Sequence, residues 1–162
     1  MALQPATLSN ENLDTMKSGK QPALMNSLNR FTDPVYCLMR LLVGLMFFCH
    51  GAQKVLGMFA KPGQPPGPPD MLTTVGGWIE VICGLLIAIG LLMRPAAFLA
   101  SGMMAVAYFM AHAGNGFFPI VNRGEMAVVY TWLFLFMFFY GPGRFSVDAM
   151  MRGGSSSAPS TS

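Results

Sequence analysis

Glu80 is the residue with the clearest potential for chemistry, because it lies within an otherwise uncharged run from Thr74 to Met93. A run of this length can cross the hydrocarbon core of a bilayer as a helix. A carboxylate inside a membrane is costly, so it must be protonated, paired or turned toward a polar cavity. Glu80 is therefore a candidate for a group that accepts or donates a proton.

Further polar residues are expected on the same side of the membrane as Glu80. They are Lys54, His50, His112, Asn115, Asn122 and Glu125. In a functional interpretation, Lys54 keeps Glu80 ionised and oriented, and the histidines relay protons or hydrogen-bond a ligand. In a structural interpretation, Lys54 and Glu80 form an ion pair that locks two helices together. A haem held by His50 and His112 is a further alternative.

The composition is that of an integral membrane protein. Of the 162 residues, 53% are hydrophobic and 10% are charged, whereas soluble domains carry about 25% charged residues. The net charge of +3 is small and dispersed, which argues against nucleic-acid binding. Cys37, Cys49 and Cys83 lie singly in apolar segments. Their spacing is not that of metal ligands, so no metal site is expected.

The apolar runs predict an all-α membrane protein, a bundle of four transmembrane helices. The spans are expected at about 35–56, 71–93, 95–113 and 125–140, with the first helix starting near Asp33–Pro34 and the third near Pro95. They form one domain, 34–148. Residues 1–33 are expected to be a flexible polar cytoplasmic leader, and the low-complexity tail 149–162 is expected to be disordered.

The distribution of lysine and arginine predicts the orientation of the spans. With four spans, one side holds Lys17, Lys20, Arg30, Arg40, Arg94, Arg144 and Arg152, and the other holds Lys54, Lys61 and Arg123. The excess on the first side puts both termini in the cytoplasm. The chain is thus expected to be a multi-pass membrane protein whose two Pro/Gly-rich loops face the periplasm or the exterior.

Helical periodicity brings several of the polar residues together. On an ideal helix, Gly44, Gly51 and Lys54 share one face with Arg40, which lies about 21 Å from Lys54 toward the cytoplasmic end. Small residues on that face let a second helix approach closely. Glu80 lies on a similar glycine stripe in the second span. The outer third of the membrane would then hold one polar pocket, formed by Lys54, Glu80, His112 and Glu125.

Several short motifs occur in a characteristic order along the chain. They are Arg40-Leu-Leu-Val-Gly44, His50-Gly-Ala-Gln-Lys54, Gly77-Trp-Ile-Glu80, Leu91-Leu-Met-Arg-Pro95, Asn122-Arg-Gly-Glu125 and Gly141-Pro-Gly-Arg-Phe-Ser-Val-Asp148. Over roughly residues 36–148 this pattern resembles the DoxX family of small bacterial membrane proteins. The resemblance implies a four-helix transmembrane bundle in the inner membrane of a bacterial cell. It also matches Arg40, Lys54, Glu80 and Glu125 to the family's characteristic polar positions.

The DoxX resemblance further implies a link to redox chemistry. The family takes its name from a subunit of an archaeal terminal-oxidase and thiosulfate:quinone oxidoreductase system, and other members are linked to membrane redox complexes. The first hypothesis is therefore a quinone-interacting or accessory subunit of a membrane oxidoreductase, with Glu80, His50 and His112 at a proton and quinone site. The chain carries no dinucleotide fingerprint, so it would be at most one subunit of an enzyme.

The second hypothesis is a non-catalytic membrane scaffold or a small-solute or lipid-binding protein. In this case the polar residues of the spans form a binding site or structural ion pairs: Lys54, Glu80, Arg40, Glu125 and Asn122. Either hypothesis expects contact with the lipid bilayer and with a membrane or periplasmic protein. The small-residue helix faces also allow the chain to form a homo-oligomer.

Overall fold

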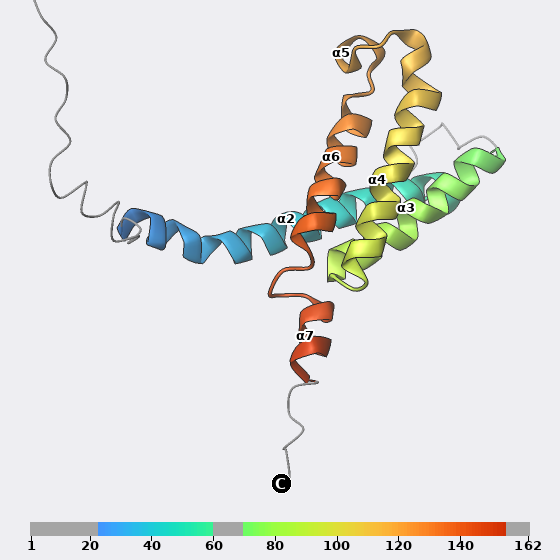
Figure 1. Cartoon of the computed structure of the whole chain (residues 1–162). Coiled ribbons are helices and arrows are strands. Elements are labelled where there is room, and N and C mark those ends of the chain that lie inside the picture. Colours follow the sequence, from blue (N-terminus) through green and yellow to red (C-terminus); the bar gives the residue numbers. More distant parts are fainter. Residues whose placement is uncertain (1–22, 60–69, 155–162) are drawn as a thin grey trace, which may run out of the picture. The chain divides into compact units, whose positions relative to one another are not determined.

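A computed structural model describes residues 23–59 and 70–154, and the described backbone is helical without strands. The elements follow in the order α2 (Ala23–Val55), α3 (Met71–Ile89), α4 (Met93–Ala107), η1 (Tyr108–His112), η2 (Ala113–Asn115), α5 (Pro119–Asn122), α6 (Glu125–Tyr140) and α7 (Val147–Gly154) (Figure 1). The all-α prediction is confirmed. Most of the expected leader and tail, 1–22 and 155–162, and much of the first loop, 60–69, lie outside the described residues.

Within the described ranges 23–59 and 70–154, three helical segments are long and apolar enough to cross a membrane: Ser27–Val55, Met71–Ile89 and Met93–Asn115. A fourth apolar helix, Glu125–Tyr140, has 16 residues and would rise about 24 Å. That rise is less than the roughly 30 Å of a bilayer core. The chain is therefore a membrane protein with several apolar helices that contact lipid.

Helix α2 begins at Ala23, well before the start expected at Asp33–Pro34, and continues through Pro34. A proline in a helix interior removes one hydrogen bond and costs roughly 3 kcal/mol, but it need not end the helix. The sequence pattern did not predict that the helix extends to the N-terminal side of Pro34. Contacts within the chain divide it into Met1–Asp33 and Pro34–Ser162. All of the features below belong to the second unit.

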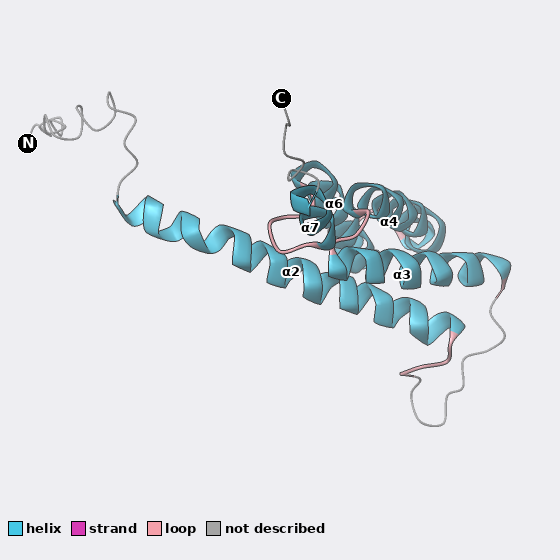
Figure 2. Ribbon diagram, turned by 90° about the horizontal axis from the view of Figure 1, so that it is seen from below, coloured by secondary structure: helices cyan, strands magenta, loops and turns pink. Residues whose placement is uncertain are grey.

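Glycines allow α2 and α3 to run side by side in close contact, as Figure 2 shows. A Cβ atom on Gly44 would lie 2.5 Å from the backbone nitrogen of Ala88, and one on Gly84 would lie 2.5 Å from that of Phe48. Farther along, a Cβ on Gly51 would lie 2.5 Å from the carbonyl oxygen of Gly77. Any larger residue would push the backbones apart, so the glycine stripes set the separation of the two helices.

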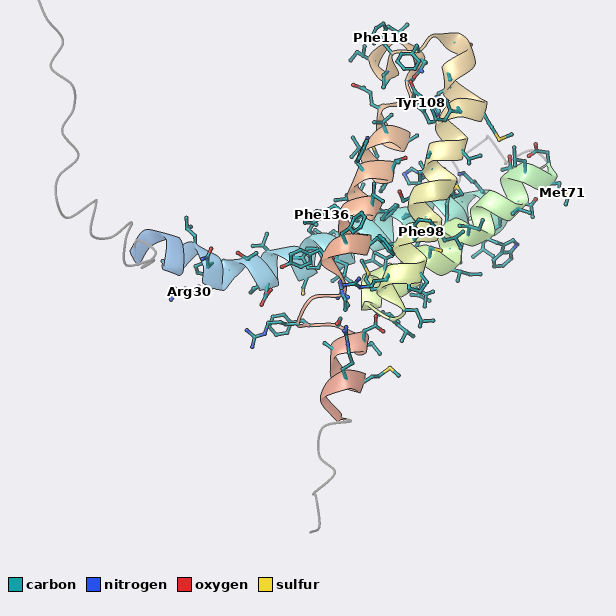
Figure 3. The ribbon with its side chains drawn as sticks, in the orientation of Figure 1. Arg30, Met71, Phe98, Tyr108, Phe118 and Phe136 are labelled. Atoms are coloured by element: carbon teal, nitrogen blue, oxygen red, sulfur yellow. The ribbon has the colours of Figure 1, made fainter. Side chains whose placement is uncertain are left out.

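Helices α4 and α6 pack against each other and complete the core. The Ser101 hydroxyl of α4 donates a hydrogen bond of 2.8 Å to the carbonyl oxygen of Thr131 in α6. The ring of Phe134 packs edge-on against Phe47 of α2, with centroids 4.7 Å apart. Many large apolar side chains stay on the outside, including Phe98 and Phe136, which Figure 3 labels. Such side chains are suited to contact with lipid rather than water.

Helix α7 lies at the opposite end of α4 and α6 from α5 (Figure 1). The Asp148 carboxylate accepts hydrogen bonds from the backbone N–H groups of Leu92 and Met93, at 2.9 and 3.0 Å. Ser146 Oγ accepts another from the N–H of Ala149. Asp148 thus binds donors at the start of α4 that lack intrahelical partners. Residues 149–154, part of the tail expected to be disordered, lie in α7. Composition alone did not reveal this long-range contact.

The turn between α3 and α4 depends on Gly90, which has a φ of +70°. Helix α4 then starts at Met93 rather than at Pro95, which is its third residue. A Cβ on Gly90 would lie 1.5 Å from Arg40 Nη1 and 2.6 Å from Ser146 Cβ. The turn therefore requires glycine both for its backbone conformation and for the space that Arg40 takes.

We expect Gly90→Ala to lower the free energy of unfolding by about 2 kcal/mol more than Gly57→Ala, because only Gly90 has a neighbour in the way. Gly57 also has a positive φ, +64°, but no neighbour among the described residues lies within 4 Å of its Cβ position. Its replacement costs only the backbone strain of about 1 kcal/mol. Unfolding by SDS titration, followed by far-ultraviolet circular dichroism, measures both. An equal loss of unfolding free energy in the two variants would show that the Arg40 side chain can move aside without an energetic cost.

Candidate functional site

A cavity of about 410 Å³ lies among α2, α3, the α4–η1 segment and the start of α6. Ligand-binding cavities typically measure about 300–1,000 Å³. Its walls are mostly apolar, with a smaller set of polar side chains. The lining residues are Phe47, His50, Lys54, Leu72, Thr73, Val75, Gly76, Ile79, Glu80, Met103, Met104, Val106, Ala107, Met110, Ala111, His112, Arg123, Met126, Ala127 and Tyr130.

An ion pair between α2 and α3 forms part of the cavity wall. Lys54 Nζ lies 2.6 Å from Glu80 Oε1. The Glu80 side chain is 4% exposed, whereas that of Lys54 is 40% exposed. Lys54 therefore retains contact with the outside while it compensates the charge of the buried carboxylate. A buried charge is tolerated when it is paired in this way.

Two buried polar atoms of cavity-lining residues have no hydrogen-bond partner among the described residues: Glu80 Oε2 and Tyr130 Oη. Buried polar atoms nearly always have a partner, since leaving one unpaired costs about 1–3 kcal/mol. The two atoms come from different helices, α3 and α6. Their shared need for a partner at one cavity is the observation that most favours a bound polar group there.

The third apolar segment changes its helical pitch where it reaches the cavity. Helix α4 passes into the π-helical turn η1, which carries His112, and such turns are frequent at functional sites. His112 Nδ1 lies 3.1 Å from the carbonyl oxygen of Asn122. A carbonyl oxygen can only accept, so the bond assigns the hydrogen to Nδ1. In the neutral ring, Nε2 is then a hydrogen-bond acceptor.

The Asn122 side chain holds the connection between η1 and α6. Its amide nitrogen donates to the carbonyl oxygen of Gly116 at 2.6 Å and to the Tyr108 hydroxyl at 3.1 Å. Its oxygen accepts from the N–H of Gly124 at 2.8 Å, and the Tyr108 hydroxyl donates to the carbonyl oxygen of Phe117. Figure 3 shows Tyr108 and Phe118 close together at this end of the molecule. Asn122 thus supports the cavity wall rather than lining it.

Comparison with known proteins agrees with the motif order. A family model named DoxX matches residues 35–113. An uncharacterized protein of Haemophilus influenzae is 38% identical over 128 residues, covering 76% of this chain and 96% of the relative. An uncharacterized membrane protein of Mycobacterium tuberculosis is 29% identical over 144 residues, covering 78% and 87%. The chain belongs to the DoxX family. No solved structure matches it.

The DoxX match includes four of the cavity's polar residues, and each of them was a candidate from the sequence. Lys54, Glu80, His50 and His112 all line the cavity. The ring of His50 also lies 6.2 Å from that of Tyr130, in an edge-on arrangement. The structure therefore brings the expected proton-transfer candidates together at one cavity.

Other candidates lie elsewhere. Glu125 is exposed in the first turn of α6 and is not among the residues that line the cavity, contrary to the expectation. Asn115 is exposed and does not line it either. Arg40 is buried away from the cavity, where its Nη2 donates to the carbonyl oxygen of Phe145 at 2.8 Å. Arg40 is close to the end of α3, where the helix dipole favours a positive charge.

Tyr130 and Arg123 line the cavity. Tyr130 was not singled out from the sequence, and Arg123 entered only as a charge on the outer side. Both lie beyond residue 113, where the DoxX model match ends. Within α6 a signal was present, since Met126, Ala127 and Tyr130 recur at the three- and four-residue spacing of one helix face. Arg123 could not be found in this way, because it lies in the preceding turn with a φ of +60°.

Among the described residues, no group of three or more histidine, cysteine, aspartate or glutamate side chains is arranged to hold a metal ion. The polar groups at the cavity are instead a carboxylate, a phenol, a threonine hydroxyl, two imidazoles and two basic side chains. Such a set can exchange hydrogen bonds and protons with a small organic ligand.

Proposed function

We propose that the cavity binds a quinone and that this DoxX protein is a quinone-interacting or accessory subunit of a membrane oxidoreductase. The observation that carries the proposal is a largely apolar cavity with two buried polar atoms, Glu80 Oε2 and Tyr130 Oη, which have no partner in the part of the chain that the structure describes. A quinone has a flat apolar ring with two polar oxygens, so it can satisfy such atoms and fill the space around them. When bound, it supplies two-electron, two-proton redox chemistry.

The cavity residues have distinct roles in this proposal. The Tyr130 hydroxyl hydrogen-bonds a ring oxygen, and Glu80 takes up or releases the proton at its Oε2. Lys54 holds Glu80 as a carboxylate through their 2.6 Å ion pair. His112 Nε2 is a second acceptor, and His50 supplies a further imidazole at the wall. Phe47 and the methionines of α4 and α6 provide apolar contact for the ring and its tail.

A partner protein completes the proposed reaction. The sequence contains no dinucleotide-binding fingerprint and no cysteine spacing of an iron–sulfur site, so we assign electron transfer to another membrane or periplasmic subunit. This leaves the DoxX chain with ligand binding and proton handling.

Filling the cavity tests the proposal. Gly76 lines the cavity, and none of the neighbouring residues that the structure describes comes within 4 Å of its Cβ position. Gly76→Leu should therefore place its side chain in the cavity without a backbone clash. Gly102→Leu is the matched control, since its Cβ position is equally open but it does not line the cavity. The protein is purified in mild detergent, extracted with solvent and analysed by chromatography.

We expect near-stoichiometric quinone in the wild-type protein and the Gly102→Leu variant, and about a tenfold lower amount in Gly76→Leu, as for loss of roughly 1.4 kcal/mol of binding. Quinone no higher than in an unrelated membrane protein would overturn the proposal.

A second candidate function is a scaffold or lipid-binding protein, which the short Lys54–Glu80 ion pair between two helices favours. The same extraction separates the two functions, because recovery of a phospholipid or fatty acid that Gly76→Leu loses would identify a lipid site. Recovery of no ligand at all would favour the scaffold.

For the membrane arrangement we propose four spans, with α6 as the fourth, and both termini in the cytoplasm of a bacterial cell. The domain from 34 to 148 contains the spans, and residues 1–33 precede it. The lysine and arginine distribution supports this orientation, and bilayer thinning around the short α6 would accommodate its length. A green fluorescent protein fused to the C-terminus should fluoresce, and alkaline phosphatase fused there should be inactive. The reverse would overturn the orientation.

A further inference from the structure

Two polar residues of the cavity wall, Glu80 and His112, offer a ligand only hydrogen-bond acceptors. Glu80 Oε1 already accepts from Lys54 Nζ, and Oε2 has no partner within the described part of the chain. An ionised carboxylate has no hydrogen to donate. His112 Nδ1 is engaged by the carbonyl oxygen of Asn122, so Nε2 is a second acceptor in the neutral ring. The deep carboxylate therefore needs a donor from any ligand that fills the cavity.

The hydrogen-bond donors on the cavity wall, unlike Glu80 Oε2, do not need a ligand as their partner. The Lys54 side chain is 40% exposed. Arg123, His50 and Thr73 also line the cavity and are exposed. These four side chains can therefore bond water at the mouth. The Tyr130 hydroxyl is buried with Glu80, but a hydroxyl can donate or accept. Tyr130 can thus serve either redox form of a quinone, whereas Glu80 cannot.

The oxidised and reduced forms of a quinone differ in whether they can donate a hydrogen bond. The oxidised form has two carbonyl oxygens, which only accept, and would place an oxygen lone pair against the Glu80 carboxylate. The reduced form has two hydroxyl groups, one of which can donate to Oε2. A hydrogen bond to a buried charge is among the stronger ones in proteins. We infer that the cavity binds the hydroquinone more tightly than the quinone, with Glu80 as the residue that discriminates between them.

This inference rests on the proposed function and makes it specific. It assigns to the cavity a ligand that arrives or remains as hydroquinone, so the class of reaction upstream would be one that reduces quinone. Selectivity comes from one atom, Glu80 Oε2, whereas apolar contacts with Phe47 and the methionines treat both forms alike.

The test measures the affinity for each form separately. Purified protein in mild detergent is equilibrated anaerobically with decylubiquinol or decylubiquinone, and the free ligand is separated by ultrafiltration and quantified by chromatography. We expect the wild-type protein to bind the quinol about tenfold more tightly, as for one charge-assisted hydrogen bond. Circular dichroism of each variant confirms that it is folded.

Three variants isolate the role of Glu80. Glu80→Gln replaces an acceptor by an amide that can donate to a carbonyl, so the preference should vanish or reverse. Tyr130→Phe should weaken the binding of both forms and leave the ratio of the two affinities close to that of the wild type. Glu125→Gln removes an exposed carboxylate outside the cavity and should match the wild type.

The outcomes separate the inference from the proposed function. Equal affinity of the wild-type protein for the two forms would overturn the inference and leave quinone binding intact. A tenfold quinol preference that persists in Glu80→Gln would also overturn it, because Glu80 would not be the selector. Binding of neither form above the level of Gly76→Leu would overturn the proposed function itself.

Discussion

Replacing Lys54 with methionine is expected to lower the free energy of unfolding by about 3 kcal/mol, the lower end of the range for a broken buried ion pair. The reason is that the Glu80 side chain, 4% exposed, would lose its 2.6 Å partner and remain inside the protein. Methionine keeps most of the length of the lysine stem, so the loss reports the charge rather than packing. SDS titration followed by far-ultraviolet circular dichroism measures it.

The two halves of the ion pair should not be equivalent. Glu80→Gln should cost only about 1 kcal/mol, because Lys54, 40% exposed, can turn its ammonium group toward water. The double variant Lys54→Met/Glu80→Gln should recover most of the stability lost in Lys54→Met, which a double-mutant cycle quantifies. Additive losses in the double variant would mean that the two side chains do not stabilise each other.

Gly44→Ala is expected to lower the free energy of unfolding by about 3 kcal/mol, at the upper end of the cost of overpacking. The added methyl group would meet the Ala88 nitrogen at 2.5 Å and the Gly84 carbonyl oxygen at 2.7 Å. Both are backbone atoms, which cannot turn aside as a side chain can. Helices α2 and α3 would have to separate, and the cavity between them and their neighbours would change shape.

Gly102→Ala is the control for Gly44→Ala. It lies within α4, is exposed, and has nothing within 4 Å of its Cβ position. Helix propensity alone favours alanine over glycine by about 1 kcal/mol, so this variant should be neutral or slightly more stable. The same SDS titration compares them. A Gly44→Ala protein as stable as Gly102→Ala would show that the α2–α3 contact is looser than the structure has it.

Comparing Gly44→Ala with Lys54→Met shows how much of a loss of ligand binding comes from a loss of stability. Gly44 does not line the cavity, whereas Lys54 does. Gly44→Ala should therefore affect ligand binding only through the helix separation, in parallel with its loss of stability. A larger loss of ligand binding in Lys54→Met than in Gly44→Ala, at equal loss of stability, would reflect the cavity rather than general unfolding.

The sequence by itself determined that this is an all-helical membrane protein, and it located the apolar helices closely. Helix α3 starts at Met71, and α6 extends from Glu125 to Tyr140, as expected. Hydropathy predicts such segments because a chain in lipid must pair its backbone polar groups internally, which an apolar helix does by local hydrogen bonds. Helical periodicity also put Lys54 and Glu80 on faces that can meet.

Only the tertiary structure decided which polar side chains share the cavity. It includes Arg123 and Tyr130, excludes Glu125, and leaves Arg40 in a separate contact with Phe145. Helix α7 likewise depends on Asp148 reaching the start of α4. These outcomes depend on contacts between residues far apart in the chain. Local pattern cannot predict them, because the approach of the helices and the path of the turns decide which side chains meet.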